Sequence, residues 1–258
     1  MGSMYIGKRK TSLLATIIFY LALLGGAAIL VMLFGAFIGL WEPIDGFIYY
    51  RRSFEYIGYV VVGLSVATLG YLSTKKHLIG KKKAVVALLI GLGILYPTIK
   101  STVTESISYP PIHDITTDTV NPPEFVALTD PRPGSRNTLS YFNKPERQEW
   151  YPSRQLEFAA YADIKPIMSN LSPDEAYAKA LSVGQAMGWE IIGADPVAHR
   201  FEGTAVTPVF RFVDDTVVVV TARDGGSRID VRSVSRIGVG DIGVNAARIR
   251  EFITRFNG

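Results

Sequence analysis

TSLLATIIFYLALLGGAAILVMLFGAFIGLW, residues 11 to 41, contains no charged side chain. As an α-helix, at about 1.5 Å per residue, this stretch is longer than the roughly 30 Å of hydrocarbon in a bilayer. Two further uncharged runs follow, Tyr56 to Thr74 and the shorter Ala84 to Ile99. The sequence therefore predicts a membrane α-helical anchor with three transmembrane helices, all within residues 1–100.

A cleaved signal peptide is the alternative interpretation of the first run. Its basic start, Lys8 to Lys10, and the small residues Gly25 to Ala28 fit that alternative. However, the apolar run continues to Leu40, which is too long for the apolar region of a signal peptide. We therefore expect the first helix to be retained.

Lysine and arginine residues in short loops predict the orientation, because positively charged loops stay in the cytoplasm. Basic residues precede the first helix, and five lysines lie between Lys75 and Lys83. The predicted loop between the first two helices holds Arg51 and Arg52 but also three acidic residues. Three crossings from a cytoplasmic N-terminus then predict that everything after Lys100 lies outside the cytoplasm.

Charge is divided unevenly along the chain. Residues 1–100 carry 11 Lys/Arg and 3 Asp/Glu, whereas residues 101–258 carry 16 and 20. The basic pI of about 9.2 therefore belongs to the membrane half, where the lipid bilayer is the expected partner. No basic stripe indicates nucleic-acid binding. The chain has no cysteine, which excludes disulfides, thiolate catalysis and cysteine-ligated metals.

Residues 101–166 are predicted to form a proline-rich extended arm. Nine of the chain's 14 prolines lie between Tyr109 and Pro166, so this segment cannot be a run of helices. Its aromatic residues, such as Tyr141 and Phe142, indicate that much of it lies against a surface. A soluble α+β domain is then predicted for residues 167–258.

Helix and strand signals alternate in that last domain. Ser172-Pro173-Asp174-Glu175 is typical of a helix start, with Glu175 placed to close a capping box. Asp241 is predicted to cap a second helix with an apolar stripe. The predicted strands are residues 189–193, 199–207, 210–213, 216–223 and 228–235. This order predicts an antiparallel sheet with two helices on one face.

The last two strands form a predicted hairpin, because Gly225-Gly226 is typical of a two-residue turn. That turn would place Val220 opposite Val231 and Thr221 opposite Asp230. Alternation then puts Val220, Ile229 and Val231 on a packed face. Thr221, Asp230 and Arg232 are expected on the other face, exposed to water or bound to something.

Several blocks carry a resemblance to a known family. They are His113-Asp114-Ile115-Thr116-Thr117-Asp118, Asn121-Pro122-Pro123, Phe212-Val213-Asp214-Asp215, Asp230-Val231-Arg232-Ser233-Val234-Ser235-Arg236-Ile237-Gly238 and Gly240-Asp241-Ile242-Gly243-Val244-Asn245-Ala246. From about His113 to Phe256 the chain resembles a bacterial family of membrane or exported proteins, the domain of unknown function catalogued as number 1499. The resemblance implies no activity and no catalytic residue. With the predicted topology, it implies a multi-pass protein of the bacterial inner (cytoplasmic) membrane with a periplasmic C-terminal domain.

One polar cluster is the candidate ligand- or partner-binding site. It consists of Asp230, Arg232, Ser235, Arg236, Asp241 and Asn245. A helix N-terminus after a glycine-rich turn could bind a small anionic ligand, with one of the arginines completing the site. The alternative is structural: arginine and aspartate pair across the sheet, and Asp241 caps the helix.

The remaining candidates are weaker, and we predict no catalytic residue, metal or cofactor. Asp214 and Asp215 are adjacent, so on a strand they would point to opposite faces, and a turn is the favoured interpretation. His113, Asp114 and Asp118 have no second histidine nearby to complete a metal site. Ser233 and Ser235 lack a nucleophile elbow.

These observations favour a non-catalytic envelope protein that binds a membrane or periplasmic partner protein, or a small anionic ligand. The alternative is an enzyme acting on an anionic or lipid-derived envelope compound, with Asp230, Arg232 and Arg236 near the chemistry. A deep pocket lined by these three residues would favour the enzyme or a ligand binder. A sheet face covered by the arm would favour a scaffold.

Overall fold

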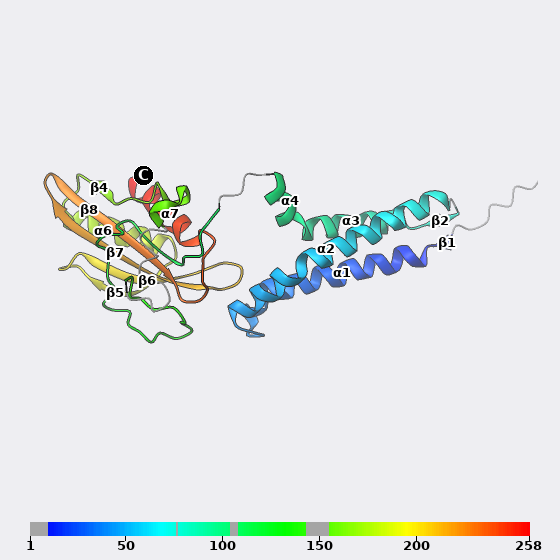
Figure 1. Cartoon of the computed structure of the whole chain (residues 1–258), viewed down its shortest axis with the longest axis horizontal. Helices are drawn as coiled ribbons and strands as arrows, with labels where there is room; N and C mark the ends of the chain where they lie inside the picture. Colours follow the sequence, from blue (N-terminus) through cyan, green and yellow to red (C-terminus); the bar gives the residue numbers. More distant parts are fainter. Residues whose placement is uncertain (1–9, 76, 104–107, 143–154) are drawn as a thin grey trace, which may run out of the picture. The chain divides into compact units, whose positions relative to one another are not determined.

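The computed structural model describes residues 10–75, 77–103, 108–142 and 155–258 (Figure 1). The chain forms two compact units, Met1–Ser106 and Ile107–Gly258, which are described separately below. Three of the basic residues used for the orientation, Lys8, Arg9 and Lys76, lie outside the described residues. So do residues 143–154 of the predicted arm.

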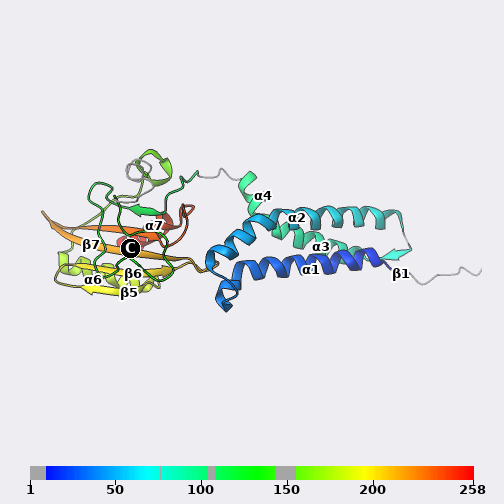
Figure 2. The ribbon, with the colours of Figure 1, turned by 60° about the horizontal axis from the view of Figure 1, so that its bottom comes forward.

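The N-terminal unit is helical. Its elements are β1 (Lys10–Thr11), α1 (Leu13–Phe34), the 3₁₀ helix η1 (Gly35–Ile38), α2 (Pro43–Thr74), β2 (Leu78–Ile79), α3 (Lys81–Ile94) and α4 (Tyr96–Val103). Figure 2 shows α1, α2 and α3 running alongside one another. Buried small side chains such as Ala22 and Ala87 let these helices pack closely. The two-residue strands β1 and β2 pair in parallel near the start of α1 and α3.

Two helical segments are long and apolar enough to cross a membrane, Leu13–Ile38 with 26 residues and Pro43–Thr74 with 32. A third crossing exists only if α3 and α4, which are bent by 59° at Leu95, count as one span. Pro97 explains the bend, because it lacks the N–H that a continuous helix needs and its ring clashes with the preceding turn. The prediction of three spans is therefore supported for two of them.

The predicted loop between the first two helices is wrong in its extent. Arg51, Arg52 and Glu55 lie inside α2, which begins at Pro43. Charged residues limit which part of a helix can lie in hydrocarbon, but they do not end the helix. Only residues 39–42 separate η1 from α2.

The C-terminal unit contains a six-stranded antiparallel sheet and two long helices (Figure 1). Its elements are β3 (Asp114–Thr116), the 3₁₀ helix η2 (Ala159–Tyr161), β4 (Ile167–Ser169), α6 (Pro173–Ala186), β5 (Glu190–Asp195), β6 (Arg200–Val206), β7 (Val213–Arg223), β8 (Gly226–Ser235) and α7 (Val244–Asn257). The order is β3-β8-β7-β6-β5, and β4 also pairs with β8. The antiparallel sheet is thus confirmed. Strand β3, which comes from the arm, and β4, which directly follows it, were not predicted. The predicted strand 210–213 is wrong because only Val213 belongs to a strand.

The main core lies between the sheet and the two helices. Val218, Val220, Ile229 and Val231 are buried in one cluster with residues of α6 and α7. Trp189 stacks on Phe252 of α7 with ring centroids 5.4 Å apart, and the predicted capping box of Ser172 and Glu175 starts α6. The face that alternation assigned to packing is therefore the face that packs.

The predicted hairpin register is wrong by two residues. Val220 pairs with Ile229 and Thr221 with Arg228, so the turn is Asp224-Gly225. Gly226 is the first residue of β8, where a Cβ atom would lie 2.1 Å from the carbonyl oxygen of Ser169 in β4. Position 226 thus needs glycine because β4 lies too close for a side chain, and not because of the turn. A shift of two residues leaves every side chain on its predicted face.

The second face of the sheet, expected to be exposed to water or bound to something, is covered by the arm. Glu202, Asp215 and Arg232 on this face are all at most 2% exposed. The carboxylate of Glu202 accepts hydrogen bonds from the backbone N–H groups of Val126 and Leu128, at 2.6 and 2.7 Å. Arm backbone is therefore held on polar groups of the sheet.

Candidate functional site

Five of the six predicted site residues are divided between the two faces of the sheet, and the sixth, Asp241, lies in the segment before α7. Asp230 and Arg232 lie on the face that the arm covers, where Arg236 also makes its contacts. Ser235 and Asn245 lie on the helix face and bond to each other at 2.9 Å. Sequence proximity suggested one cluster, but alternation along β8 separates it into two.

Arg232 is enclosed by the protein. Its guanidinium forms a two-point ion pair with Asp114 of β3, with N–O distances of 2.9 and 2.8 Å. It also donates to the carbonyl oxygens of Pro123 and Leu139 in the arm. Rings of the arm lie on it as well, because the Phe125 and Tyr141 centroids are each 5.2 Å from its central carbon. Arg232 thus fastens the arm to the middle of the sheet.

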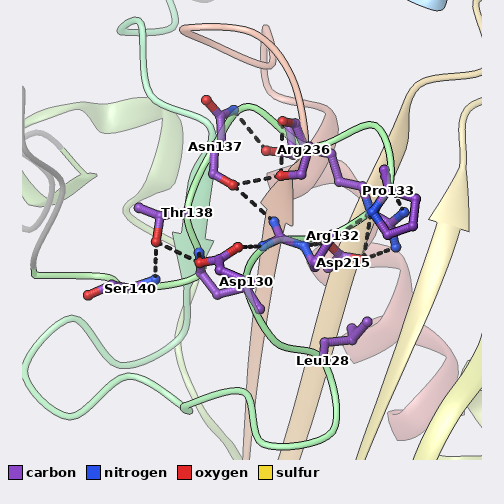
Figure 3. A network of polar contacts seen from close by, with 12 residues as sticks. Leu128, Asp130, Arg132, Pro133, Asn137, Thr138, Ser140, Asp215 and Arg236 are labelled. Carbon is purple, nitrogen blue, oxygen red and sulfur yellow. Dashed lines mark hydrogen bonds and ion pairs between the residues drawn. The ribbon is translucent and has the colours of Figure 1, made fainter.

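Arg236 belongs to a second arm contact, drawn in Figure 3. The buried carboxylate of Asp215 accepts from Arg236 at 2.8 Å and from Arg132 of the arm at 2.6 Å. Arg132 also pairs with Asp130. The Asn137 side chain donates to the carbonyl oxygens of Ser235, the last residue of β8, and of Gly238. The two guanidiniums on Asp215 make this a charge-assisted clamp.

A buried polar network lies on the helix face. Asn245 of α7 accepts from the hydroxyl of Ser233 at 2.7 Å and donates to that of Ser235. Arg248 pairs with Asp214 at 2.6 Å. Asp214 and Asp215 therefore point to opposite faces within β7, and the favoured interpretation of them as a turn is wrong. Ser233 is fully buried, so its hydroxyl is not accessible to a substrate.

Asp241 lies just before α7. Its carboxylate accepts from the N–H groups of Gly243 at 3.0 Å and Asn245 at 2.6 Å. The N-cap position itself is Gly243, with φ of 83°, so the helix begins later than predicted although Asp241 still satisfies its free N–H groups. Desolvation by burial raises the pKa of Asp241 from 3.8 to about 6, against those two hydrogen bonds, and nearby Asp214 adds to the increase.

His113, Asp114 and Asp118, one of the weaker candidates, do not form one site. The ring of His113 contacts the carbonyl oxygen of Val239, Asp114 binds Arg232, and Asp118 binds Arg228. Within the described ranges, no three His, Cys, Asp or Glu side chains come together to hold a metal ion.

A cleft of about 370 Å³ lies on the arm side of the sheet, beside Asp230. Its lining residues are Asp118, Asn121, Pro123, Glu124, Arg200, Val219, Thr221, Arg228 and Asp230. Of the six predicted site residues, the lining includes Asp230 alone. No local motif could have indicated the cleft, because its two sides are about a hundred positions apart in the sequence.

Arg228 is the central charge of this cleft. It bridges Asp118 at 2.6 Å and Asp230 at 2.7 Å, and the hydroxyl of Thr117 donates to Asp230. Burial opposes ionisation of Asp118, but the N–H groups of Asn121 and Val120 and the Arg228 guanidinium outweigh it and lower the pKa of that carboxyl. The cleft therefore carries paired charges of both signs.

Fold and site together define a protein with an N-terminal unit of apolar, membrane-length helices and an antiparallel α+β unit reinforced by buried ion pairs. A family model described as "Protein of unknown function (DUF1499)" matches residues 114–256, more than half of the chain. The chain belongs to this family, which confirms the resemblance. No curated protein matches the chain.

Proposed function

We propose that this protein is a non-catalytic binding protein of the bacterial inner membrane. In this proposal three spans anchor it, its N-terminus is cytoplasmic, and its C-terminal unit stands in the periplasm and binds a membrane or periplasmic protein. The observation that carries the proposal is that the arm closes one face of the sheet while α6 and α7 close the other. Both faces of the sheet are thus used within the domain, which leaves its outer surface for contact with a partner protein.

The number of crossings decides the orientation. If α3 and α4 together cross the membrane, the C-terminal unit lies on the opposite side from the N-terminus, whereas two crossings would place both on one side. The lysines before and within the first turn of α3 favour a cytoplasmic start for a third crossing, by the same rule that keeps basic loops inside. A bent span is compatible with a membrane when neighbouring helices satisfy its free backbone groups.

Reporter fusions test this topology. A reporter that works only after export should be active when fused after Gly258, and a cytoplasm-only reporter should be active when fused in place of residues 76–77, between α2 and α3. Activity of the cytoplasm-only reporter after Gly258 would contradict the third crossing and the periplasmic assignment together.

Binding is favoured over catalysis because the candidate arginines are engaged within the protein. An enzyme acting on an anionic compound would need Arg232 or Arg236 free to meet its substrate. Arg232 is 1% exposed and bound to Asp114, and Arg236 is bound to buried Asp215. Freeing either guanidinium would leave a buried carboxylate without its partner, which is costly.

The cleft beside Asp230 is the surface that we propose for partner contact. Its two arginines, Arg200 and Arg228, are partly exposed, while Asp118, Asp230 and the exposed Glu124 add three negative charges. A simple anion would be repelled by these carboxylates. A polypeptide segment with both positively and negatively charged side chains fits this lining better than a simple anion does.

A pair of matched variants tests the cleft. Thr221→Trp places a bulky ring in the cleft without removing any of its ion pairs, and Val197→Trp places the same ring at an exposed turn. After cross-linking in intact membranes, we expect partner recovery with the full-length protein to fall for Thr221→Trp and to stay unchanged for Val197→Trp. Equal recovery from both variants would remove the cleft from the proposal.

A further inference from the structure

The loop between β8 and α7, residues 236–243, exposes apolar side chains at one end of the C-terminal unit. Val239 is 58% exposed and Ile242 67%, and the first residue of α7, Val244, is 40% exposed. These aliphatic groups lie within six positions of one another. Isolated apolar residues on a surface are ordinary, whereas a group of them on one loop indicates a contact with something apolar.

The conformation of Ile242 keeps its side chain exposed. Its φ of 53° is in the left-handed region, which a β-branched residue rarely adopts. Asp241 fixes the backbone on either side: its N–H donates to the carbonyl oxygen of Ile112, and its carboxylate accepts from Gly243. Strained residues persist where the surrounding structure holds them, and they concentrate at sites of function.

The loop packs on the segment by which the chain enters the unit. A Cβ atom on Gly240 would lie 2.9 Å from the Cα atom of Pro111, and one on Gly243 would lie 2.4 Å from the ring of Tyr109. Tyr109 follows Val103, the last residue of α4, by six positions. Whatever its conformation, a chain of that length spans at most about 20 Å. Six residues of chain therefore link Val103 to the segment on which the exposed loop packs.

We propose that Val239, Ile242 and Val244 insert into the interface of the bilayer in which the chain is anchored. This inference rests on the proposed membrane anchor and adds a second point of membrane contact. Transfer of aliphatic side chains from water to the acyl boundary of a leaflet lowers the free energy of the system. A linker of six residues raises the effective concentration of the loop at the membrane in which the chain is anchored, so less freedom is lost on insertion than for an untethered domain.

The absence of cysteine from the chain makes a direct test available. Single cysteines replace Ile242, Val239, Val197 or Leu24, and each is labelled with a polarity-sensitive fluorophore. The full-length protein is reconstituted in vesicles of phosphatidylethanolamine and phosphatidylglycerol, with and without lipids that carry a nitroxide quencher in the acyl chain. Val197, 89% exposed in the turn after β5, is the control for solvent, and Leu24, 67% exposed on α1, is the control for lipid.

We expect labels at Ile242→Cys and Val239→Cys to emit at shorter wavelength and to be quenched by the nitroxide lipids, as at Leu24→Cys. The label at Val197→Cys should show neither effect. Quenching at position 24 without quenching at 242 and 239 would overturn this inference and leave the anchor standing. No quenching at position 24 would overturn the anchor and the inference together. A shorter wavelength at 242 without quenching would indicate a protein contact and would also overturn it.

Discussion

Arg232 of β8 and Asp114 of β3 form a two-point ion pair across 118 positions of sequence, and both side chains are essentially inaccessible to water. The pair joins the first strand of the C-terminal unit to its central hairpin. Through the carbonyl oxygens of Pro123 and Leu139, the same guanidinium also holds the arm. A residue that was a candidate for ligand binding is therefore a structural centre of the domain.

Arg232→Ala should destabilise the C-terminal unit by about 3 to 5 kcal/mol, because it leaves the Asp114 carboxylate buried without a counter-ion. The free energy of unfolding is measured by urea-dependent pulse proteolysis of the full-length protein in nanodiscs. Arg255→Ala is the control, since Arg255 pairs with Glu251 on an exposed helix surface. The control should change stability by less than about 1 kcal/mol. Equal effects of the two variants would show that the Arg232 pair is not structural.

The second prediction concerns the two adjacent glycines between β7 and β8, Gly225 in the turn and Gly226 at the start of β8. Gly226→Ala should destabilise the unit by about 1 to 3 kcal/mol or more, because its Cβ atom meets the Ser169 carbonyl and its φ is 150°. Gly225→Asn should be close to neutral, since nothing lies within 4 Å of the added Cβ and asparagine tolerates the φ of 75°. The same proteolysis assay compares them. Equal stability of the two variants would contradict the close approach of the Ser169 carbonyl oxygen to Gly226.

The faces of the hairpin are tested by two adjacent substitutions. Val220→Asp should unfold the C-terminal unit, because Val220 is 3% exposed in the core and an unpaired carboxylate there costs several kcal/mol. Thr221→Asp should be tolerated, since Thr221 is exposed and pairs with Arg228 in the observed register. Near-ultraviolet circular dichroism reports the loss of packing. Similar loss in both variants would contradict the assignment of faces.

Local patterns predicted the parts of the fold that depend on neighbours in sequence. The capping box at Ser172, the alternation in β7 and β8 and the apolar runs of α1 and α2 all rest on spacings of a few residues. The predictions failed where a distant segment decides the outcome. The register depends on the close approach of β4 to Gly226. Strand β3 is a three-residue strand inside the proline-rich stretch, and β4 is a three-residue strand directly after it.

The candidate site shows the same division. Arg232, Arg236 and Asp230 belong to the densest polar group in the sequence, and each of them forms an ion pair in the structure. Whether they bind a ligand or the protein itself depends on Asp114 and Asp215, and on an arm whose path has no sequence signature. The structural alternative accounts for both arginines. The cleft at Arg228 has no sequence signal, because residues 118–124 line one side of it and residues 200–230 the other.

The last prediction concerns pH and Asp241. Burial raises the pKa of its carboxyl from 3.8 to about 6, so between these pH values the folded protein binds a proton that the unfolded chain releases. The contribution of Asp241 to stability is therefore fully present below about pH 4 and is lost as the pH rises towards 6. Asp241→Asn removes this titration while keeping one acceptor for the N–H of Asn245.

The melting temperature of the C-terminal unit in full-length wild-type protein minus that of Asp241→Asn should therefore fall between pH 4 and pH 6 and stay level above about pH 7. Subtraction is needed because Asp163, bound to Arg250, and Glu175, bound to Ser172, have lowered pKa values and contribute the opposite dependence at lower pH.

Asp241→Ala should cost about 0.5 to 2 kcal/mol near neutral pH, because both N–H groups lose their acceptor. A difference that does not vary between pH 4 and 6 would mean that Asp241 remains in contact with water in the folded protein.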